Sequence, residues 1–490
     1  MVPRTRTGTT QQVFAPFLPS TMRGFVPTPD AIVDLMVAKL FDGKPPSRDS
    51  SVLDPGCGAG AFVQGIIRWC ARHHVEVPEI FGVESDPRRY AEAAAKFRGV
   101  RSVTIVNEDF LARSGRRFDY VVGNPPYVAI NRLSESERAA FRVEYATARG
   151  RFDLYLLFFE QALRLLKAGG RLVFITPEKF LYVKTAEPLR RILGGLGVKE
   201  VLLVDEETFG SLVTYPTITT VDHVPPSAGT KAVLRDGTAK TIRFPVDGSS
   251  LLPLLNGHTG PSPSGLRLED ICIRVSCGVA TGADKVFVRE TESLPKALAR
   301  FAYPTVSGRQ LVPGQEHVRT GHSILVPYDH EGNLCRLKEL GALGEYLTSQ
   351  RHRLTARTCV KRKPWYAFHD SAPLPEILRP KLLCKDITAA PGFWLDREGT
   401  LVPMHSVYYI VPKHPTSLDD LASYLNSSEA LRWMRAHCQR AANGFLRLQS
   451  AILKKLPVPP ALAAPAEHAA DRQMCRKTIR SMHGALVLSR

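Results

Sequence analysis

The stretch Phe118-Asp-Tyr-Val-Val-Gly-Asn-Pro-Pro-Tyr127 joins an apolar run to a stiff polar loop. The run Phe118–Gly123 predicts a buried strand of a parallel sheet, because such strands are covered on both faces. Pro125 and Pro126 then fix φ and remove two backbone donors, so the loop carbonyls face outward. The Asn124 amide oxygen and a proline carbonyl can accept two hydrogen bonds from one planar amino group, and Tyr127 offers that group's ring a flat face. We interpret Asn124–Tyr127 as a holder for an amino group; a proline-rich turn with a buried tyrosine is the simpler alternative.

Upstream, Ser51-Val-Leu-Asp-Pro-Gly-Cys-Gly-Ala-Gly60 predicts a strand, a glycine-rich turn and the start of a helix. The spacing of Gly56, Gly58 and Gly60 differs from the dinucleotide pattern G-x-G-x-x-G, and the acidic residue Asp54 precedes the glycines. Pyrophosphate binding uses helix N-terminal N–H groups, whereas a leading aspartate suits a cationic or zwitterionic ligand. The amino-acid end of S-adenosylmethionine is such a ligand. Cys57 is expected to serve packing.

Two further strands also end in acidic residues. Glu79–Val83 runs into Glu84, which lies where doubly wound nucleotide folds hold a ribose diol, while Asp86 is a candidate cap for the next helix. Val103–Val106 is followed by Asp109-Phe110, where the carboxylate could bond an adenine amino group while the ring packs on the base. A surface turn with a buried Phe110 is the alternative.

Four successive strands thus place polar or glycine residues at their carboxyl ends. In open α/β sheets, ligands bind in the crevice outside those ends. The sequence therefore predicts a doubly wound, mostly parallel α/β sheet with one ligand site. Before the first strand, Thr28 is a plausible N-cap, with Pro29 opening the helix over Ala31–Phe41. Alternatively, Thr28 touches a ligand at the sheet edge. A second long helix is expected over 178–196.

The 490-residue chain is long enough for two or three domains, and its formal charge of +18 favours an anionic partner, usually nucleic acid. Its 9 cysteines form no metal-like cluster and fit a reducing cytoplasm, so we expect no metal. No apolar run approaches a membrane span, and no signal peptide is recognisable. We divide the chain into a flexible arm (1–23), a catalytic domain (24–224), a linker with a hairpin (225–265), a DNA-binding domain (266–460) and a tail (461–490).

Basic residues stand beside aromatic ones in the DNA-binding part, which would suit contacts to phosphates and bases, although a solvated basic face is the alternative. The stretches are Lys361-Arg-Lys-Pro-Trp-Tyr-Ala-Phe368, Arg379-Pro-Lys381 and Gly444-Phe-Leu-Arg447.

With the glycine-rich loop, Glu84, Asp109-Phe110 and Asn124–Tyr127 in this order, the chain resembles the γ-class adenine-N6 DNA methyltransferases of restriction–modification and phage-defence systems. The resemblance covers residues 24–221 and extends more loosely over 268–287, which is similar to the opening of the family's target recognition domain. It implies the class I S-adenosylmethionine-dependent methyltransferase fold followed by an α+β recognition domain. Double-stranded DNA would be the substrate, and a separate endonuclease or other defence subunit is left open.

By this resemblance, one set of residues would bind S-adenosylmethionine: Thr28, Asp54, Gly56, Gly58, Glu84, Asp109 and Phe110. The loop Asn124, Pro125, Pro126 and Tyr127 would be catalytic and hold the target adenine. The family also has an aromatic residue near the last strands that packs on the flipped base. Phe209 is the best match here, with Tyr215 as second choice.

Three alternatives stay open at this point. The same tetrapeptide holds a glutamine amide in methyltransferases of release factors and a base in ribosomal RNA enzymes, but those chains lack a large C-terminal domain. Cytosine-N4 is a chemically possible target, and the chain could be a silent DNA-binding subunit. No nuclease motif and no Pro-Cys nucleophile is present, so neither cleavage nor cytosine-C5 chemistry is expected.

Overall fold

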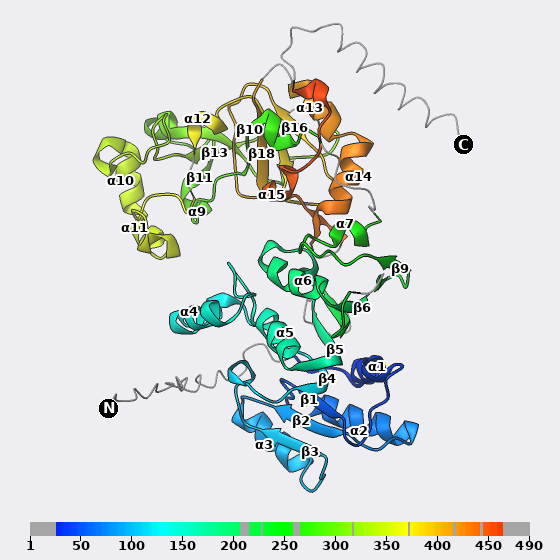
Figure 1. Cartoon of the computed structure of the whole chain (residues 1–490). Helices are drawn as coiled ribbons and strands as arrows, with labels where there is room; N and C mark the ends of the chain where they lie inside the picture. The colour runs from blue at the N-terminus through cyan, green and yellow to red at the C-terminus, as the bar shows by residue number, and fades with distance from the viewer. Residues whose placement is uncertain are drawn as a thin grey trace, which may run out of the picture. The chain divides into compact units, whose positions relative to one another are not determined.

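The structure is a computed structural model that describes residues 26–205, 215–226, 229–257, 265–315, 318–370, 373–414, 418–441 and 444–463. The chain divides into two compact units, residues 1–255 and 256–490, which are coloured blue to green and green to red in Figure 1. The expected arm (1–23) and most of the expected tail (461–490) lie outside the described residues.

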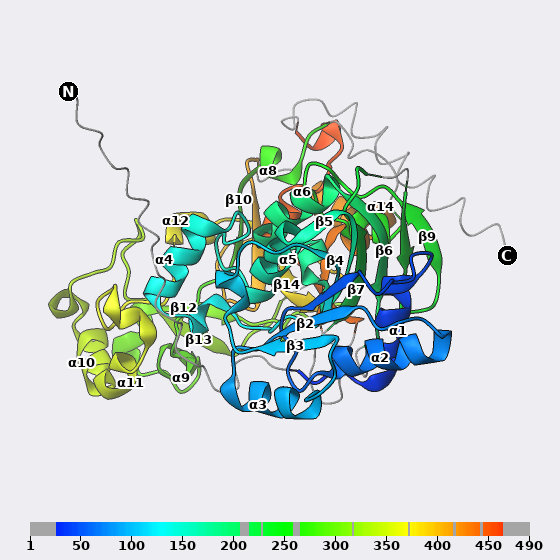
Figure 2. The same ribbon diagram turned by 60° about the horizontal axis from the view of Figure 1, so that its bottom comes forward.

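The first unit is built on one sheet, with strands in the order β3-β2-β1-β4-β5-β7-β6-β8-β9 within the described residues (Figure 2). β1 to β5 are parallel to one another, and β7 runs antiparallel between β5 and β6. This is the doubly wound, mostly parallel sheet that the sequence predicts. The strands are β1 (Ser51–Asp54), β2 (Glu79–Val83), β3 (Val103–Val106), β4 (Phe118–Gly123), β5 (Leu166–Pro177), β6 (Gly197–Leu203), β7 (Pro216–Asp222), β8 (Thr230–Val233) and β9 (Ala239–Ile242).

Helices connect these strands. They are α1 (Asp30–Phe41), α2 (Ala61–His73), α3 (Pro87–Lys96), α4 (Glu135–Glu144), α5 (Leu154–Arg164), α6 (Glu187–Gly194), α7 (Leu252–Leu255) and the 3-10 turns η1 (Phe110–Ala112), η2 (Ile130–Arg132), η3 (Glu178–Leu181) and η4 (Lys184–Ala186).

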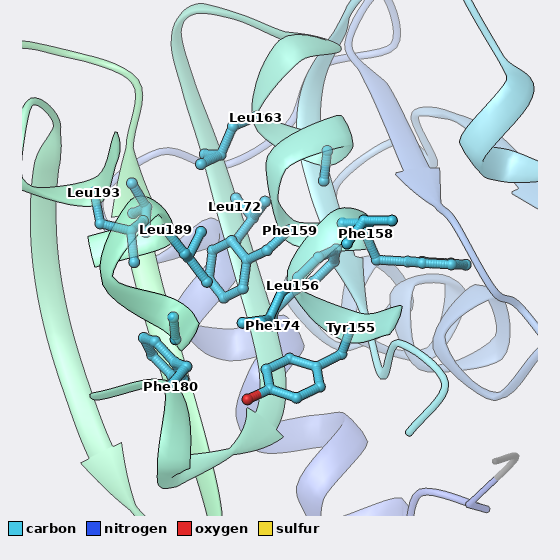
Figure 3. Close-up of a cluster of buried hydrophobic side chains, with 14 of the residues drawn as sticks. Tyr155, Leu156, Phe158, Phe159, Leu163, Leu172, Phe174, Phe180, Leu189 and Leu193 are labelled. Carbon is cyan, nitrogen blue, oxygen red and sulfur yellow. The ribbon is translucent and has the colours of Figure 1, made fainter. Parts of the chain in front are cut away.

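The sheet separates two apolar cores, because successive strand residues point to opposite faces. On one face, Val52 of β1 lies in a cluster with buried residues of α1 and α2. On the other face, Leu53 lies in a cluster with α5 and α6. Figure 3 shows part of this second cluster, where Phe159 of α5 meets Phe174 of β5 edge to face at 5.2 Å between ring centroids. Both faces of β1 are thus buried along its whole length, including the polar residues Ser51 and Asp54 at its two ends.

The hairpin expected within 225–265 is present as β8 and β9, which pair antiparallel. It does not stand apart as a linker, because β8 also pairs with β6 and extends the catalytic sheet. Thr230 Oγ1 donates a 2.7 Å hydrogen bond to the Val198 carbonyl across this junction. The structure therefore assigns the segment to the first unit, which ends at Leu255.

Two helix predictions are wrong in detail. α1 begins at Asp30 with Pro29 at the N-cap, and Thr28 does not cap it. The helix expected over 178–196 is broken into η3, η4 and α6. Pro188 is the cause that the sequence offers, since proline is tolerated in the first turn of a helix and disrupts its interior.

The second unit is an α+β domain, as expected, with three small sheets in the described residues: β10-β18-β14-β16, β11-β13-β12-β17 and β15-β20-β19. Its strands are β10 (Cys272–Cys277), β11 (Val288–Glu290), β12 (Ala302–Val306), β13 (His322–Leu325), β14 (Lys381–Lys385), β15 (Ile387–Thr388), β16 (Trp394–Asp396), β17 (Val402–Pro403), β18 (Val407–Pro412), β19 (Gln439–Arg440) and β20 (Leu446–Arg447).

The helices of this unit are short, and two apolar clusters lie beneath them. They are α8 (Leu268–Ile271), α9 (Asp284–Phe287), α10 (Ala342–Ser349), α11 (Arg351–Thr355), α12 (Leu374–Ile377), α13 (Leu418–Leu425), α14 (Ser428–His437), α15 (Ser450–Leu453) and the 3-10 turns η6 (Lys296–Phe301), η7 (Leu337–Leu340), η8 (Thr358–Lys361) and η11 (Pro460–Leu462). Across the described ranges of both units, none of the helices has the length and apolar composition needed to cross a membrane.

Candidate active site

The predicted site residues gather at one edge of the first unit's sheet. Asp54 ends β1, Glu84 follows β2, Asp109 follows β3 and Asn124 follows β4. These four strands are adjacent and parallel, so their carboxyl ends lie together. The structure thus brings all four predicted polar positions to one crevice edge, as the sequence argument requires.

Asp54 is fully buried, and neither of its carboxylate oxygens has a hydrogen-bond partner among the described residues. Burial raises its pKa to about 8, and the nearby Glu84 carboxylate adds to the rise. A buried carboxyl group with free acceptors is costly unless a ligand completes its bonding. The site therefore fits a ligand with a cationic or N–H donor group, such as the amino end of S-adenosylmethionine.

The end of β4 passes close to Asp54 because Gly123 has no side chain. A Cβ placed on Gly123 would lie 3.3 Å from Asp54 Oδ1 and 3.2 Å from Pro55 Cδ. This contact is tighter than most side chains tolerate, so glycine lets the Asn124–Tyr127 loop start directly beside the buried carboxyl group. The acidic position and the amino-holding position are therefore neighbours in space although 70 residues separate them in the chain.

Glu84 is buried and ties the glycine-rich loop to the second strand. Its Oε2 accepts a 2.9 Å hydrogen bond from the Gly58 amide, and its Oε1 accepts one of 2.8 Å from the Asp86 amide. Asp86 in turn caps α3 by accepting from the Arg88 and Arg89 amides, which confirms its predicted role. Glu84 thus has a structural task in fixing the loop, and its expected contact with a ribose stays a prediction.

The loop itself needs its glycines. Gly58 and Gly60 adopt φ values of +54° and +84°, and a Cβ on Gly60 would overlap the Phe97 ring at 2.2 Å. Burial raises the pKa of the Cys57 thiol, which directly precedes Gly58, so it is a packed thiol and not a nucleophile.

Asp109 and Phe110 follow β3 at the same edge of the sheet. Asp109 caps η1 by accepting a 2.9 Å hydrogen bond from the Leu111 amide, and burial raises its pKa. The Phe110 ring is 2% exposed and lies 5.0 Å from the Phe158 ring. The turn with a buried phenylalanine is therefore observed, and a contact of the pair with adenine remains a prediction.

Asn124 is oriented by the segment that precedes α1. Its Nδ2 donates to the Val26 carbonyl and to Thr28 Oγ1, both at 3.1 Å. Its Oδ1 is buried and has no hydrogen-bond partner among the described residues. The amide is thus held with its acceptor free. Local sequence carries no signal for this bond, because it predicts for Thr28 either a helix cap or contact with a ligand at the sheet edge.

Tyr127 is held in place by contacts to β5 and α5. Its hydroxyl donates a 3.4 Å hydrogen bond to the Ile175 carbonyl of β5, and its ring meets the Tyr155 ring edge to face at 6.2 Å. Burial raises the pKa of Tyr127, so the phenol stays neutral. Pro125 is buried and Pro126 is half-buried between these two anchored residues. The tetrapeptide is therefore fixed at both ends.

Phe209, the preferred stacking residue, lies outside the described residues. Tyr215, the second choice, is described: the Arg235 guanidinium lies 5.1 Å from its ring centroid. Arg235 Nη2 also donates a 2.5 Å hydrogen bond to the buried Glu178 carboxylate. Sequence reasoning missed Arg235 and Glu178, since only the fold brings the β8–β9 turn against the end of β5.

In the second unit, the predicted DNA-contacting stretches are only partly exposed. Phe368 is buried in the core, and Trp365 and Tyr366 pack against it. Lys381 is also buried and pairs with Asp396, so its predicted contact with DNA is wrong. Lys361 and Arg362 remain exposed. Phe368, Trp365 and Tyr366 therefore contribute to the core of the second unit. The composition of these stretches does not reveal this burial.

Comparison with known proteins identifies both units. Residues 79–207 match the Eco57I restriction-modification methylase family, and residues 331–458 match the TaqI-like C-terminal specificity domain. The chain is 27% identical to the type II methyltransferase M.PaeR7I of Pseudomonas aeruginosa, over 94% of this chain and 92% of the relative. It is 28% identical to M.XhoI of Xanthomonas vasicola, over 74% and 72% of the two chains.

A solved structure of the Type IIL restriction-modification enzyme MmeI in complex with DNA shares the fold, with a TM-score of 0.61 over 86% of this chain and 65% of that chain, at 13% identity. The resemblance seen in the sequence is thus confirmed at the level of both domains. The chain is a DNA methyltransferase of the restriction–modification type, with an S-adenosylmethionine-dependent methylase domain followed by a specificity domain.

Proposed function

We propose that this enzyme methylates N6 of a flipped-out adenine at a specific site in double-stranded DNA. The observation that carries the proposal is the orientation of Asn124: Nδ2 is bonded to Val26 and Thr28, which leaves the buried Oδ1 as a free acceptor. An exocyclic amino group is the donor that such an acceptor suits. A base inside a duplex is out of reach of this loop, so the target must be extruded.

The chain's contribution to the reaction is positioning and electrostatic stabilisation. Asn124 Oδ1 and the Pro125 carbonyl would each accept a hydrogen bond from one N–H of the amino group. These two bonds would pull the nitrogen toward tetrahedral geometry and localise its lone pair. The same oxygens stabilise the positive charge that develops there. Tyr127, held by Ile175 and Tyr155, would support the base ring. Phe209 remains the proposed second stacking residue.

The cofactor would be held by Asp54 at its amino end, by Glu84 at its ribose and by Asp109 and Phe110 at its adenine. Gly56 and Gly58 would let the backbone of the glycine-rich loop approach it closely. When bound, S-adenosylmethionine would supply an electrophilic methyl group to N6 and leave as the neutral thioether, and the proton that N6 loses would pass to water. The family resemblance implies a cofactor contact for Thr28 as well, but its hydroxyl accepts a hydrogen bond from Asn124, so we propose that Thr28 instead positions the Asn124 amide.

Relatives of this chain are named as type II methyltransferases, and we infer that this enzyme protects its site from a separate endonuclease. The eight described cysteines are free thiols, which fits action on cellular DNA in the cytoplasm.

The test is to sequence, by a long-read method that distinguishes N6-methyladenine from N4-methylcytosine, DNA from cells that express the wild type or Asn124→Ala. A motif carrying N6-methyladenine only with the wild type is expected. Asn131→Ala, at an exposed position of η2, is the matched control and should modify the motif fully. N4-methylcytosine in the motif would overturn the assignment of adenine as the target base. Absence of any modified base in DNA from cells with the wild type would overturn the assignment of DNA as the substrate.

Purified Asn124→Ala should still bind cofactor in calorimetry, because the cofactor contacts proposed above do not include its side chain. A variant that loses binding as well would show that Asn124 supports the fold of the site, and would leave its role in holding the amino group without support.

A further inference from the structure

The second unit contains an open pocket of about 560 Å³ that the proposed reaction does not use. Three loops from different strands surround it: the turn after β12, the β14–β15 junction and the segment between β17 and β18. Its lining residues are Asp284, Ser307, Gly308, Arg309, Lys385, Asp386, Ile387, Met404, His405 and Ser406. We call it the Lys385 pocket.

The backbone of this pocket is rigid. Ser406 joins the three loops, because its Oγ accepts a 3.1 Å hydrogen bond from the Gly308 amide and its carbonyl accepts one of 3.0 Å from the Asp386 amide. The Met404 amide donates to the Val306 carbonyl at 2.9 Å, and the Leu448 amide donates to the Asp386 carbonyl at 2.8 Å. A site that discriminates ligands by hydrogen bonding needs such a fixed frame.

The side chains on this frame differ in chemistry. Arg309 is exposed and Lys385 is half-buried, and neither forms an ion pair with another described residue. Ile387 is 45% exposed, which is unusual for a large apolar side chain in this protein. The pocket thus offers a ligand two cationic donors that form no ion pair among the described residues, together with one exposed apolar side chain.

Asp386 adds an acceptor. Its Oδ1 is buried without a hydrogen bond among the described residues and forms an ion pair with Arg447 Nε at 3.5 Å. A pocket built only to bind phosphate would exclude a carboxylate, because phosphate contacts need cations and N–H donors. Cations, a carboxylate and an apolar group together match the donors, acceptors and thymine methyl groups that base edges present in the major groove.

We propose that the Lys385 pocket reads base edges of the recognition site, with Lys385 and Arg309 as donors to guanine, Asp386 as acceptor from a cytosine amino group and Ile387 as contact for a thymine methyl group. This inference rests on the proposed action on DNA. It assigns sequence discrimination to these four residues, none of which lies in the first unit.

The experiment uses the full chain and duplexes that carry the methylated motif of the wild type, each with one base pair replaced. The rate of methyl transfer, as kcat/KM, is measured on every duplex for the wild type, Lys385→Met, Asp386→Asn, Ile387→Ala and Arg309→Met. Arg432→Ala, an exposed arginine of α14 outside the pocket, is the control for loss of one positive charge. Thermal unfolding verifies that each variant is folded.

We expect the pocket variants to methylate DNA with relaxed discrimination, so that the penalty for one particular base pair falls about 10- to 100-fold while the penalties at other positions stay unchanged. Asp386→Asn is the most conservative variant, since it keeps the shape of the side chain and changes only its bonding. Arg432→Ala should show the discrimination of the wild type.

Two results would overturn the inference. If every pocket variant kept the discrimination of the wild type at all positions, the pocket would not read bases. If the variants lost the same factor on all duplexes, the pocket would contact the DNA backbone only. Failure of the proposed function looks different: the wild type itself would methylate no duplex.

Discussion

Asn124 Nδ2 and Thr28 Oγ1 are joined by a 3.1 Å hydrogen bond across 96 residues of sequence. Together with the second hydrogen bond, from Asn124 Nδ2 to the Val26 carbonyl, it uses both hydrogens of the Asn124 amide. Oδ1 is left free to accept a hydrogen bond from a ligand. Thr28 therefore orients the Asn124 side chain. Its hydroxyl fixes which atom of the amide is left free to accept a hydrogen bond.

Replacing Thr28 by Val keeps the shape of the side chain and removes this acceptor. One hydrogen bond is worth about 1 kcal/mol, so we expect the single-turnover methylation rate to fall about fivefold to tenfold while cofactor affinity is unchanged. Thr28→Ser, which restores the hydroxyl, should recover the rate. If Thr28→Val weakened cofactor binding and left the rate intact, Thr28 would be a cofactor contact, as the family resemblance implies.

Asp54 makes the stability of the cofactor-free protein depend on pH. An ordinary aspartate has a pKa near 3.9, whereas that of folded Asp54 is about 8. Between roughly pH 4 and 8 the folded state therefore keeps a proton that the unfolded chain loses, so stability falls as pH rises through this window.

Asp54→Asn removes this proton and should flatten the dependence. We expect the unfolding temperature of the wild type to drop relative to that of the variant between pH 6 and 8, as measured by scanning calorimetry without cofactor. Curves that stay parallel over this range would contradict a raised pKa at Asp54.

Arg235 links the β8–β9 turn to η3 through Glu178, which also accepts a 3.3 Å hydrogen bond from Tyr182. Removing one member of a buried ion pair costs about 3 kcal/mol. Arg235→Ala should therefore lower the unfolding temperature of the first unit by roughly 5–10 °C.

The double variant Arg235→Ala with Glu178→Gln tests whether the cost comes from the unpaired charge. It should recover part of the lost stability, because no buried carboxylate is then left without its cation. Additive losses in the double variant would show that the two residues act independently.

Lys361 and Arg362 are the exposed cations of the stretch 361–368. If both contact phosphates, Lys361→Ala with Arg362→Ala weakens binding to DNA of any sequence and reduces the slope of log affinity against log salt by about two. Fluorescence anisotropy over a salt series measures the slope. Unlike the Lys385 pocket variants, this variant should keep the base discrimination of the wild type, and a changed preference would contradict a backbone role.

Local sequence was sufficient for the framework of the site. Asp54, Glu84, Asp109 and Asn124 each follow a short apolar run, and parallel strands place their carboxyl ends at one edge, so the crevice could be predicted before any coordinates. The glycines at 58 and 60 likewise follow from the tight turn that they permit. The division into a catalytic part and a basic C-terminal part was also visible in the order of motifs and in composition.

Other features depend on contacts between distant segments, which periodicity and turn chemistry do not encode. The bond from Asn124 to Thr28, the Arg235–Glu178 pair and the burial of Lys381 against Asp396 all join residues from separate elements. Local pattern predicted a cap at Thr28, a linker at the hairpin and a DNA contact at Lys381. Local sequence is enough to indicate which strands end in polar groups. The tertiary structure alone decided how those groups are oriented and which charges are buried, because orientation and burial are set by neighbours that are remote in the chain.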